Sequence, residues 1–195
     1  MSNSKNRKSR ILATLFFVFV ILGVFYFIYS AIQSDSNPDV SSVEDQTQKI
    51  EEMMIGGVQD FQAPTINNST FKLSQLTHKV IIINFWASWC GPCVEEIPSL
   101  LKLIKNSNGQ VALVALSLDN DEKQMLEFLR NYDTSDENIF WLKDPQYTLA
   151  EGFGTFKLPE SYILNRERLL IKKISGAIDW SSEEVTSLIN TEIQK

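Results

Sequence analysis

The stretch that most constrains the fold of this chain runs from Val80 to Ile104 and holds both of its cysteines, Cys90 and Cys93. An apolar, largely β-branched run, Val80 to Phe85, precedes the cysteines and predicts a buried strand. After Cys93, apolar residues recur at intervals of three and four, which is typical of a helix: Ile97, Leu100, Leu101 and Ile104. The two cysteines are therefore predicted to lie where a strand ends and a helix begins.

This position has a chemical consequence for the two thiols. The N-terminus of a helix carries unpaired N–H groups and the positive end of the helix dipole, and both favour a thiolate over a thiol. A thiolate is the species that attacks a disulfide. We therefore expect Cys90, at the helix entrance, to be the attacking sulfur, and Cys93, one turn in, to be the resolving sulfur.

The residues around the cysteines resemble those of a known family. Residues 89–93, Trp-Cys-Gly-Pro-Cys, look like the active site of the thioredoxin superfamily. The longer run at 84–98, Asn-Phe-Trp-Ala-Ser-Trp-Cys-Gly-Pro-Cys-Val-Glu-Glu-Ile-Pro, is more specific. It is similar to the TlpA/ResA/CcmG (DsbE) proteins, a membrane-anchored extracytoplasmic branch in which Cys-x-Pro-Cys-x-x-Glu-x-Pro recurs. The resemblance extends from about Gln59 to the end of the chain and implies a thiol–disulfide oxidoreductase.

A pair of cysteines at this spacing can also be half of a zinc site. Zinc needs two further ligands, and the sequence offers no other cysteine and a single histidine, His78. The strand–CxxC–helix context is the one that a redox motif requires. We therefore favour a redox-active pair and expect no metal or cofactor other than the redox-active disulfide of Cys90 and Cys93.

The resemblance also implies roles for residues outside the cysteine pair. Glu96 matches a family glutamate implicated in proton transfer, and it lies one helical turn after Cys93. Asn84 stands where ordinary thioredoxins carry a buried aspartate, and an amide cannot take a proton, so Glu96 becomes the candidate base. Pro159 resembles the cis-proline that faces the cysteines in this fold. The backbone of Leu158 would then pair with a substrate chain.

The remaining candidate substrate contacts lie in the motif itself. Gly91 and Pro92 shape the turn between the cysteines, and a glycine at this position resembles thioredoxins that act as reductants. Trp89 is expected to shield the sulfurs or to line the surface on which a substrate docks, whereas Trp86 is expected to pack in the core. The glycine between the cysteines therefore favours a reducing protein.

The N-terminal part of the chain differs sharply in composition from the rest. Residues 1–10 carry four basic residues and no acid, and the 22 residues 11–32 carry no charge. At 1.5 Å per residue this run is about 33 Å long, enough to cross a bilayer core of about 30 Å. We expect a transmembrane anchor at 11–32, with the basic tail 1–10 in the cytoplasm. A cleaved signal peptide is the alternative, but its apolar region normally spans only about 7–15 residues.

The rest of the chain is expected to comprise a linker and one domain. Residues 33–57 are polar and acidic and predict a linker, with a short helix near 46–54. Residues 58–195 are expected to form the thioredoxin-like domain, an α/β fold with an N-terminal β-hairpin and a central α/β insertion near 119–151. The patterns predict strands at 61–66, 70–73, 80–85, 111–118, 139–142, 162–164 and 169–174, and helices after Cys93, at 119–131, at 145–150 and from 181 onward.

Three local signals add detail to these elements. Asp119 or Asn120 is expected to cap the helix at 119–131. Ser181 with Glu184 fits a capping box at the start of the last helix. In the turn 165–168, Asn165 is expected to take a positive φ angle, which asparagine tolerates.

The leading hypothesis is a single-pass protein of the cytoplasmic membrane whose C-terminal domain reduces protein disulfides on the extracytoplasmic, periplasmic side. The resemblance implies apocytochrome c as substrate, in cytochrome c maturation, and a membrane thiol donor of the CcdA/DsbD kind. A net charge of −6 argues against nucleic acid as a partner. The alternatives are a disulfide oxidase or isomerase of secreted proteins, a peroxidase-like antioxidant and a redox-inert tethered binding domain.

Overall fold

The computed structural model describes residues 18–29 and 38–195, and the chain divides into two compact units, residues 1–44 and 45–195. In the first unit, residues 18–29 form a helix with exposed side chains. No helix among the described residues is both long and apolar enough to span a bilayer. The anchor predicted at 11–32 extends beyond the described residues at both of its ends, and the predicted basic tail at 1–10 lies wholly outside them.

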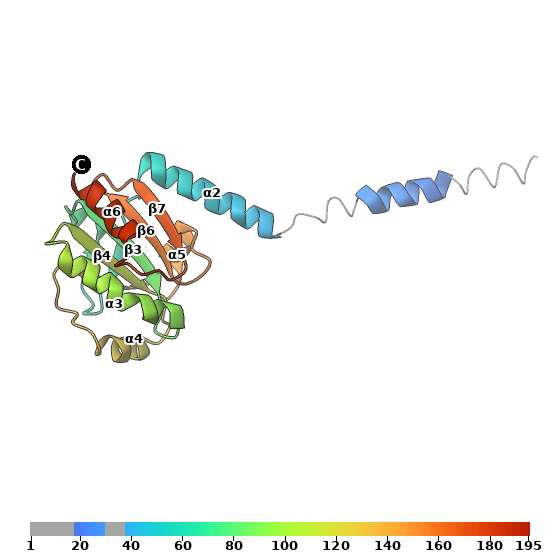
Figure 1. Ribbon diagram of the computed structural model, residues 1–195. Coiled ribbons are helices and arrows are strands. Elements are labelled where there is room, and N and C mark those ends of the chain that lie inside the picture. The colour runs from blue at the N-terminus through green and yellow to red at the C-terminus, as the bar shows by residue number, and fades with distance from the viewer. Residues whose placement is uncertain (1–17, 30–37) are drawn as a thin grey trace, which may run out of the picture. The chain divides into compact units, whose positions relative to one another are not determined.

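The second unit is built on a five-stranded sheet with the strand order β5-β4-β3-β6-β7 (Figure 1). The central strand β3 and its neighbour β4 are parallel, and every residue in them is buried, as their continuous apolar runs predict. Strand β5 pairs parallel to β4, while β6 is antiparallel to both β3 and β7. The strands are β3 (Val80–Trp86), β4 (Val111–Ser117), β5 (Ile139–Lys143), β6 (Glu160–Asn165) and β7 (Leu170–Ser175).

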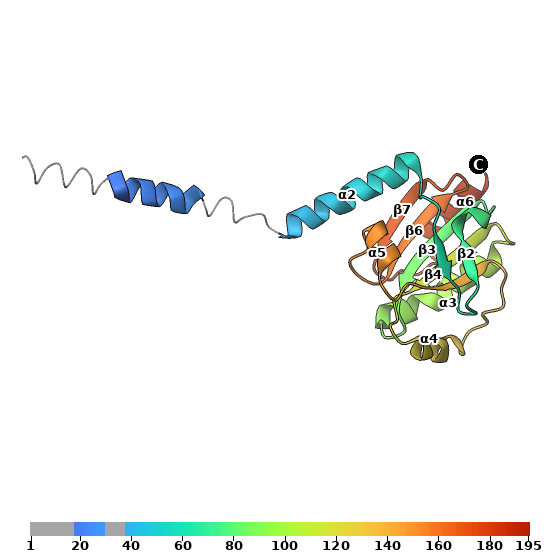
Figure 2. The ribbon, with the colours of Figure 1, turned by 180° about the vertical axis from the view of Figure 1, so that it is seen from behind.

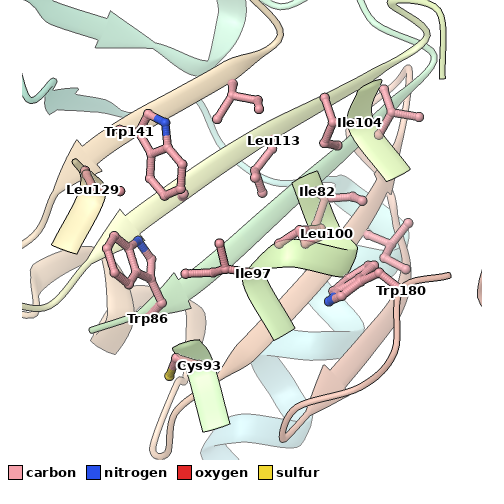
Figure 3. Close-up of a cluster of buried hydrophobic side chains, with 14 of the residues drawn as sticks. Ile82, Trp86, Cys93, Ile97, Leu100, Ile104, Leu113, Leu129, Trp141 and Trp180 are labelled. Atoms are coloured by element: carbon pink, nitrogen blue, oxygen red, sulfur yellow. The ribbon is translucent and has the colours of Figure 1, made fainter. Parts of the chain in front are cut away.

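Each face of this sheet carries its own apolar layer. Helices α3 (Gly91–Asn106) and α6 (Glu183–Ile193) cover one face, and α4 (Glu122–Leu129) contributes to the same cluster. Figure 3 shows this cluster, in which Ile97, Leu100 and Ile104 of α3 pack toward β3 and β4. Strand β2 (Thr70–Lys72) and helix α5 (Thr148–Phe153) lie over the other face (Figure 2). The observed α/β layers therefore match the fold expected from the sequence.

The predicted N-terminal hairpin is present. Strands β1 (Gln62–Pro64) and β2 pair antiparallel, and a short 3₁₀ helix, η1 (Leu73–Gln75), follows them. Asn68, in the turn between the strands, has a φ angle of 60°. Asparagine tolerates this left-handed conformation better than most residues, which is why the turn forms here.

The helix predicted near 46–54 is present, but after residue 44 the segment is part of a compact unit rather than the linker expected at 33–57. Helix α2 (Pro38–Gly56) occupies it, and residues 45–57 belong to the second compact unit. Met53 is buried, Gln46 Nε2 donates to the Gly154 carbonyl at 2.7 Å, and Lys49 Nζ donates to the Glu151 carbonyl at 3.1 Å. Ile50 and Met53, three residues apart, form an apolar helix edge within an otherwise acidic sequence.

The predictions for the turn 165–168 and for the start of the last helix are wrong. Arg168, rather than Asn165, has the positive φ angle, 65°, while Asn165 Oδ1 accepts from the Leu169 amide at 2.9 Å. Helix α6 begins after Ser182 as its N-cap, so Ser181 does not form the predicted capping box. The Ser181 amide instead donates to Asp179 Oδ1 at 2.8 Å, and this Asx turn ends the loop before the helix.

Candidate active site

The cysteine pair lies at the junction of β3 and α3, as predicted. Cys90 is the N-cap residue of α3, and the two cysteines form a disulfide with a Cα–Cα distance of 5.3 Å. The Cys93 amide donates to Cys90 Sγ at 3.3 Å. Cys90 is 7% exposed whereas Cys93 is fully buried. An incoming substrate therefore has better access to Cys90 than to Cys93.

Glu96, one turn after Cys93 on α3, is a buried carboxylate rather than a solvated one. It is only 3% exposed, and its oxygens accept three N–H groups. Asn84 Nδ2 donates to Oε1 at 2.9 Å, while the Ile178 amide and Trp180 Nε1 each donate to Oε2 at 3.3 Å. Burial raises the pKa of Glu96 above its ordinary value, and the hydrogen bonds from Asn84, Trp180 and Ile178 act in the opposite direction.

The predicted cis-proline is connected to the same network. The Leu158–Pro159 peptide bond is cis, which confirms the geometry that the resemblance implied. Asn84 Nδ2, besides contacting Glu96, donates to Ser161 Oγ at 2.9 Å, and Ser161 lies two residues after Pro159. Asn84 therefore connects the helix that carries the cysteines to the strand that follows the cis-proline.

Asp119 has a function that the sequence did not reveal. Helix α4 is capped by Asp121, which accepts from the Lys123 amide at 2.9 Å, so the predicted capping by Asp119 or Asn120 is wrong. Asp119 is buried and instead contacts the loop between β3 and Cys90. Its carboxylate accepts from Ser88 Oγ at 2.6 Å and from the Ser88 amide at 3.0 Å. It thereby fixes the loop immediately before the cysteine pair.

Two exposed aromatic side chains flank segments of the site. Trp89, directly before Cys90, is 62% exposed, and Phe156, three residues before Pro159, is 59% exposed. Gly91 and Pro92 are also exposed, in the first turn of α3. Trp86, by contrast, is fully buried in the core, as predicted. Exposed apolar surface thus adjoins both the cysteine pair and the cis-proline.

A buried ion pair follows the cis-proline on the other face of the sheet, and sequence reasoning missed it. Lys173 Nζ lies 3.1 Å from Glu160 Oε2, and Ser175 Oγ donates to Glu160 Oε1 at 2.7 Å. Lys173 also stands 5.1 Å from the centroid of the Tyr162 ring. Burial lowers the pKa of Lys173, and the neighbouring Glu160 carboxylate counteracts that effect. This ion pair links β6 to β7 beside the cis-proline.

Comparison with known protein families shows which family the chain belongs to. The family described as Redoxin matches residues 35–189. The chain belongs to the redoxin family. This redoxin is 29% identical to the thioredoxin-like protein YneN of Bacillus subtilis (strain 168), over 57% of its own length and 65% of that relative. It is 25% identical to the thiol-disulfide oxidoreductase ResA of the same strain, over 61% of its length and 65% of ResA.

The redoxin therefore spans less than two thirds of the length of these two relatives. Among solved structures, it resembles a DsbE-type thiol:disulfide interchange protein from Chlorobium tepidum, with a TM-score of 0.62 and 24% identity. That match covers 70% of this redoxin and 95% of the other chain. The likeness confirms the thioredoxin-like fold that the sequence predicted.

Proposed function

We propose that this redoxin is a thiol–disulfide oxidoreductase that reduces protein disulfides outside the cytoplasmic membrane. The observation that carries the proposal is the Cys90–Cys93 disulfide at the N-terminus of α3. A helix N-terminus favours the thiolate that exchange requires, and the greater access of Cys90 favours it as the attacking sulfur. The name of the ResA relative, a thiol-disulfide oxidoreductase, supports thiol–disulfide exchange.

The reduced pair would act in two exchange steps. The Cys90 thiolate attacks one sulfur of the substrate disulfide, so that a bond forms from Cys90 Sγ to that sulfur while the substrate S–S bond breaks and releases the other sulfur as a thiolate. The Cys93 thiolate then attacks Cys90 Sγ, closes the Cys90–Cys93 disulfide and releases the second substrate thiolate. Two electrons pass to the substrate, whose thiolates take up two protons. A membrane dithiol donor, of the CcdA/DsbD kind, would reduce the pair again.

Glu96 is proposed as the group that accepts the proton of Cys93. The Cys93 thiol is fully buried, so its proton has no direct access to bulk water. Glu96 lies one turn away on the same helix, and its raised pKa brings it closer to the pH at which a proton acceptor is effective. Asn84, at the position of the thioredoxin aspartate, cannot accept a proton and orients Glu96 instead.

The substrate chain is proposed to dock between the cysteines and the cis-proline. The backbone before a cis-proline is suited to pair with an extended peptide, which assigns that role to Leu158. Trp89 and Phe156 offer exposed aromatic surface to apolar side chains of the substrate, and Gly91 and Pro92 leave the first turn of α3 uncovered. Such a surface suits a reductase that accepts unfolded chains.

The proposed substrate is apocytochrome c, and the proposed location is the outer side of the cytoplasmic membrane. The run Pro159-Glu160-Ser161 resembles the Pro-Glu-Thr run of the cytochrome c maturation members, which reduce a Cys-x-x-Cys-His segment before haem attachment. The uncharged run at 11–32 and the basic residues before it support an N-terminal membrane anchor. An oxidising exterior makes a membrane dithiol donor necessary for a reductive role.

Trapping the mixed disulfide tests this proposal. In the full chain, Cys93→Ser keeps the attacking Cys90 but removes the resolving thiol, so the covalent complex with the natural substrate should accumulate. Cys90→Ser is the matched control and should trap nothing. Recovery of an apocytochrome supports the maturation role, whereas recovery of folded secreted proteins favours an oxidase or isomerase. A complex formed by Cys90→Ser in place of Cys93→Ser would reverse the assigned roles.

A further inference from the structure

The segment that connects β7 to α6, Gly176 to Ser182, contacts both halves of the site. At its start, the Gly176 amide donates to the Pro159 carbonyl at 2.8 Å. Two and four residues later, the Ile178 amide and the Trp180 indole N–H both donate to Glu96 Oε2. Two of the three N–H groups that bind the Glu96 carboxylate therefore come from a segment more than 80 residues away in the sequence.

Trp180 is itself held by packing and by a hydrogen bond from its backbone. Its side chain is fully buried in the same apolar cluster as Ile97 and Leu100 (Figure 3). Its backbone amide donates to Ser99 Oγ at 3.1 Å, and Ser99 Oγ donates to the Glu96 carbonyl at 2.9 Å. Trp180 is therefore bonded to the Glu96 residue through the carboxylate and, by way of Ser99, through the backbone.

The other buried tryptophans provide a comparison. Within residues 18–29 and 38–195, the indole nitrogens of Trp86 and Trp141 are buried without a hydrogen-bond partner. The core thus tolerates a tryptophan whose N–H group is unpaired, and packing alone does not account for the placement of the Trp180 indole. The indole nitrogen of Trp180 donates instead to the carboxylate of Glu96, the proposed proton acceptor.

We propose that Trp180 is a positioning residue of the active site, whose indole N–H fixes the Glu96 carboxylate one helical turn from Cys93. The chain after β7 then takes part in proton handling by the cysteine pair. This last step rests on the proposed function, because it assumes that Glu96 accepts the proton of Cys93. The fixing of Glu96 by Trp180 does not depend on that assumption.

The physical consequence concerns the charge state of Glu96. An N–H donor stabilises the carboxylate and not the neutral acid, so deletion of the indole N–H should make Glu96 easier to protonate. Burial raises the pKa of Glu96, and the N–H donors of Asn84, Trp180 and Ile178 lower it. The neighbouring thiols on α3 do not titrate while Cys90 and Cys93 are joined. In the oxidised protein, the titration of Glu96 can therefore be measured without that of the cysteines.

The first experiment titrates Glu96 in the oxidised full chain, kept in detergent. Carboxyl carbon NMR of protein labelled with ¹³C-glutamate follows the ionisation, and Glu96→Gln identifies the signal by its loss. Trp180→Phe keeps an aromatic ring and deletes the N–H, and it should raise the midpoint by about one pH unit. Trp141→Phe removes an unpaired indole N–H from the same cluster and should leave the midpoint in place. An unchanged midpoint in Trp180→Phe, or equal shifts in both variants, would overturn the proposal.

A second measurement leaves Trp180 intact and so does not depend on the folding of the variant. In the wild type, the indole ¹⁵N–¹H signal of Trp180 should shift with pH at the midpoint of Glu96, while that of Trp141 stays constant. In Glu96→Gln the Trp180 signal should no longer respond. A Trp180 signal whose chemical shift does not change as Glu96 titrates would also overturn the proposal. Neither NMR measurement involves a substrate, so failure of the trapping experiment leaves their outcome unaffected.

Discussion

The Asn84 side-chain amide donates a 2.9 Å hydrogen bond to Glu96 Oε1, so a residue of the central strand holds the carboxylate of the active-site helix. The same amide nitrogen donates to Ser161 Oγ on β6. Because asparagine stands where ordinary thioredoxins carry an acid, the described residues of this buried network include one carboxyl group, that of Glu96. While Cys90 and Cys93 are joined in a disulfide, the titration of this network should therefore be that of Glu96.

The first prediction concerns the pH dependence of stability. Burial raises the pKa of Glu96 in the folded state above the ordinary value of 4.5, so the folded protein binds its proton more tightly than the unfolded chain does. The stability that Glu96 contributes is therefore full below about pH 4.5 and is lost as the pH rises through the folded-state pKa. Urea unfolding of the oxidised full chain should show this loss, and Glu96→Gln should lack it. Glu95→Gln, which changes an exposed neighbour, should retain it.

The second prediction concerns the reactivity of the thiols. If Glu96 is ionised near the reduced pair, its charge opposes thiolate formation, so Glu96→Gln should lower the midpoint of the alkylation rate against pH, by about one pH unit. Exchange with a substrate disulfide should nevertheless slow, because the proton acceptor is missing. Glu95→Gln is again the control. If the alkylation rates of wild type and Glu96→Gln depended on pH in the same way, Glu96 would have no part in the mechanism.

The third prediction concerns the loop before Cys90. Asp119→Ala leaves the Ser88 amide and hydroxyl without their acceptor and should lower the free energy of unfolding by about 2–3 kcal/mol. Ser88→Ala removes one donor and should cost about 1 kcal/mol. Since both variants remove the hydrogen bond from the Ser88 hydroxyl to the Asp119 carboxylate, the double variant should cost less than the sum, by about 1 kcal/mol. Strict additivity in urea unfolding would show that the contact contributes nothing.

The fourth prediction concerns the buried pair behind the cis-proline. Lys173→Met leaves the Glu160 charge buried and unpaired and should cost about 3–5 kcal/mol of stability, whereas Lys173→Met with Glu160→Gln should recover much of the loss. The matched control is Lys172→Met, a change on the same strand, β7, that breaks an exposed ion pair with Glu184 of α6. It should change the free energy of unfolding far less. Equal losses from Lys172→Met and Lys173→Met would mean that burial of the pair is irrelevant.

The sequence predicts the parts of the site that depend on neighbours along the chain. The junction of β3 and α3 follows from an apolar run, a change to helical spacing and the resemblance around Cys90 and Cys93. The burial of Trp86 and the cis bond before Pro159 follow from the same sources. Each of these features is specified by fewer than about 20 consecutive residues, over which periodicity and motif are informative.

The parts of the site that the sequence did not predict depend on contacts between distant segments. Asp119 has the side chain of a helix cap, but Asp121 takes that place, and the sheet brings Asp119 beside Ser88 at the end of the adjacent strand. Trp180 reaches Glu96 across 84 positions of sequence, and nothing local marks it. Side-chain identity alone could not decide between these contacts, because tertiary packing selects among several plausible hydrogen-bond partners.

The reduction potential of the full chain tests the central claim most directly. The oxidised protein is equilibrated in detergent with thiol–disulfide buffers of known potential, and the Cys90–Cys93 dithiol is quantified by alkylation. The Gly91-Pro92 pair and the reductive role predict a potential nearer to that of thioredoxin, about −270 mV, than to that of the oxidant DsbA, about −120 mV. A potential near −120 mV would contradict a reductase and identify an oxidase, and a disulfide that does not equilibrate at all would contradict redox activity of any kind.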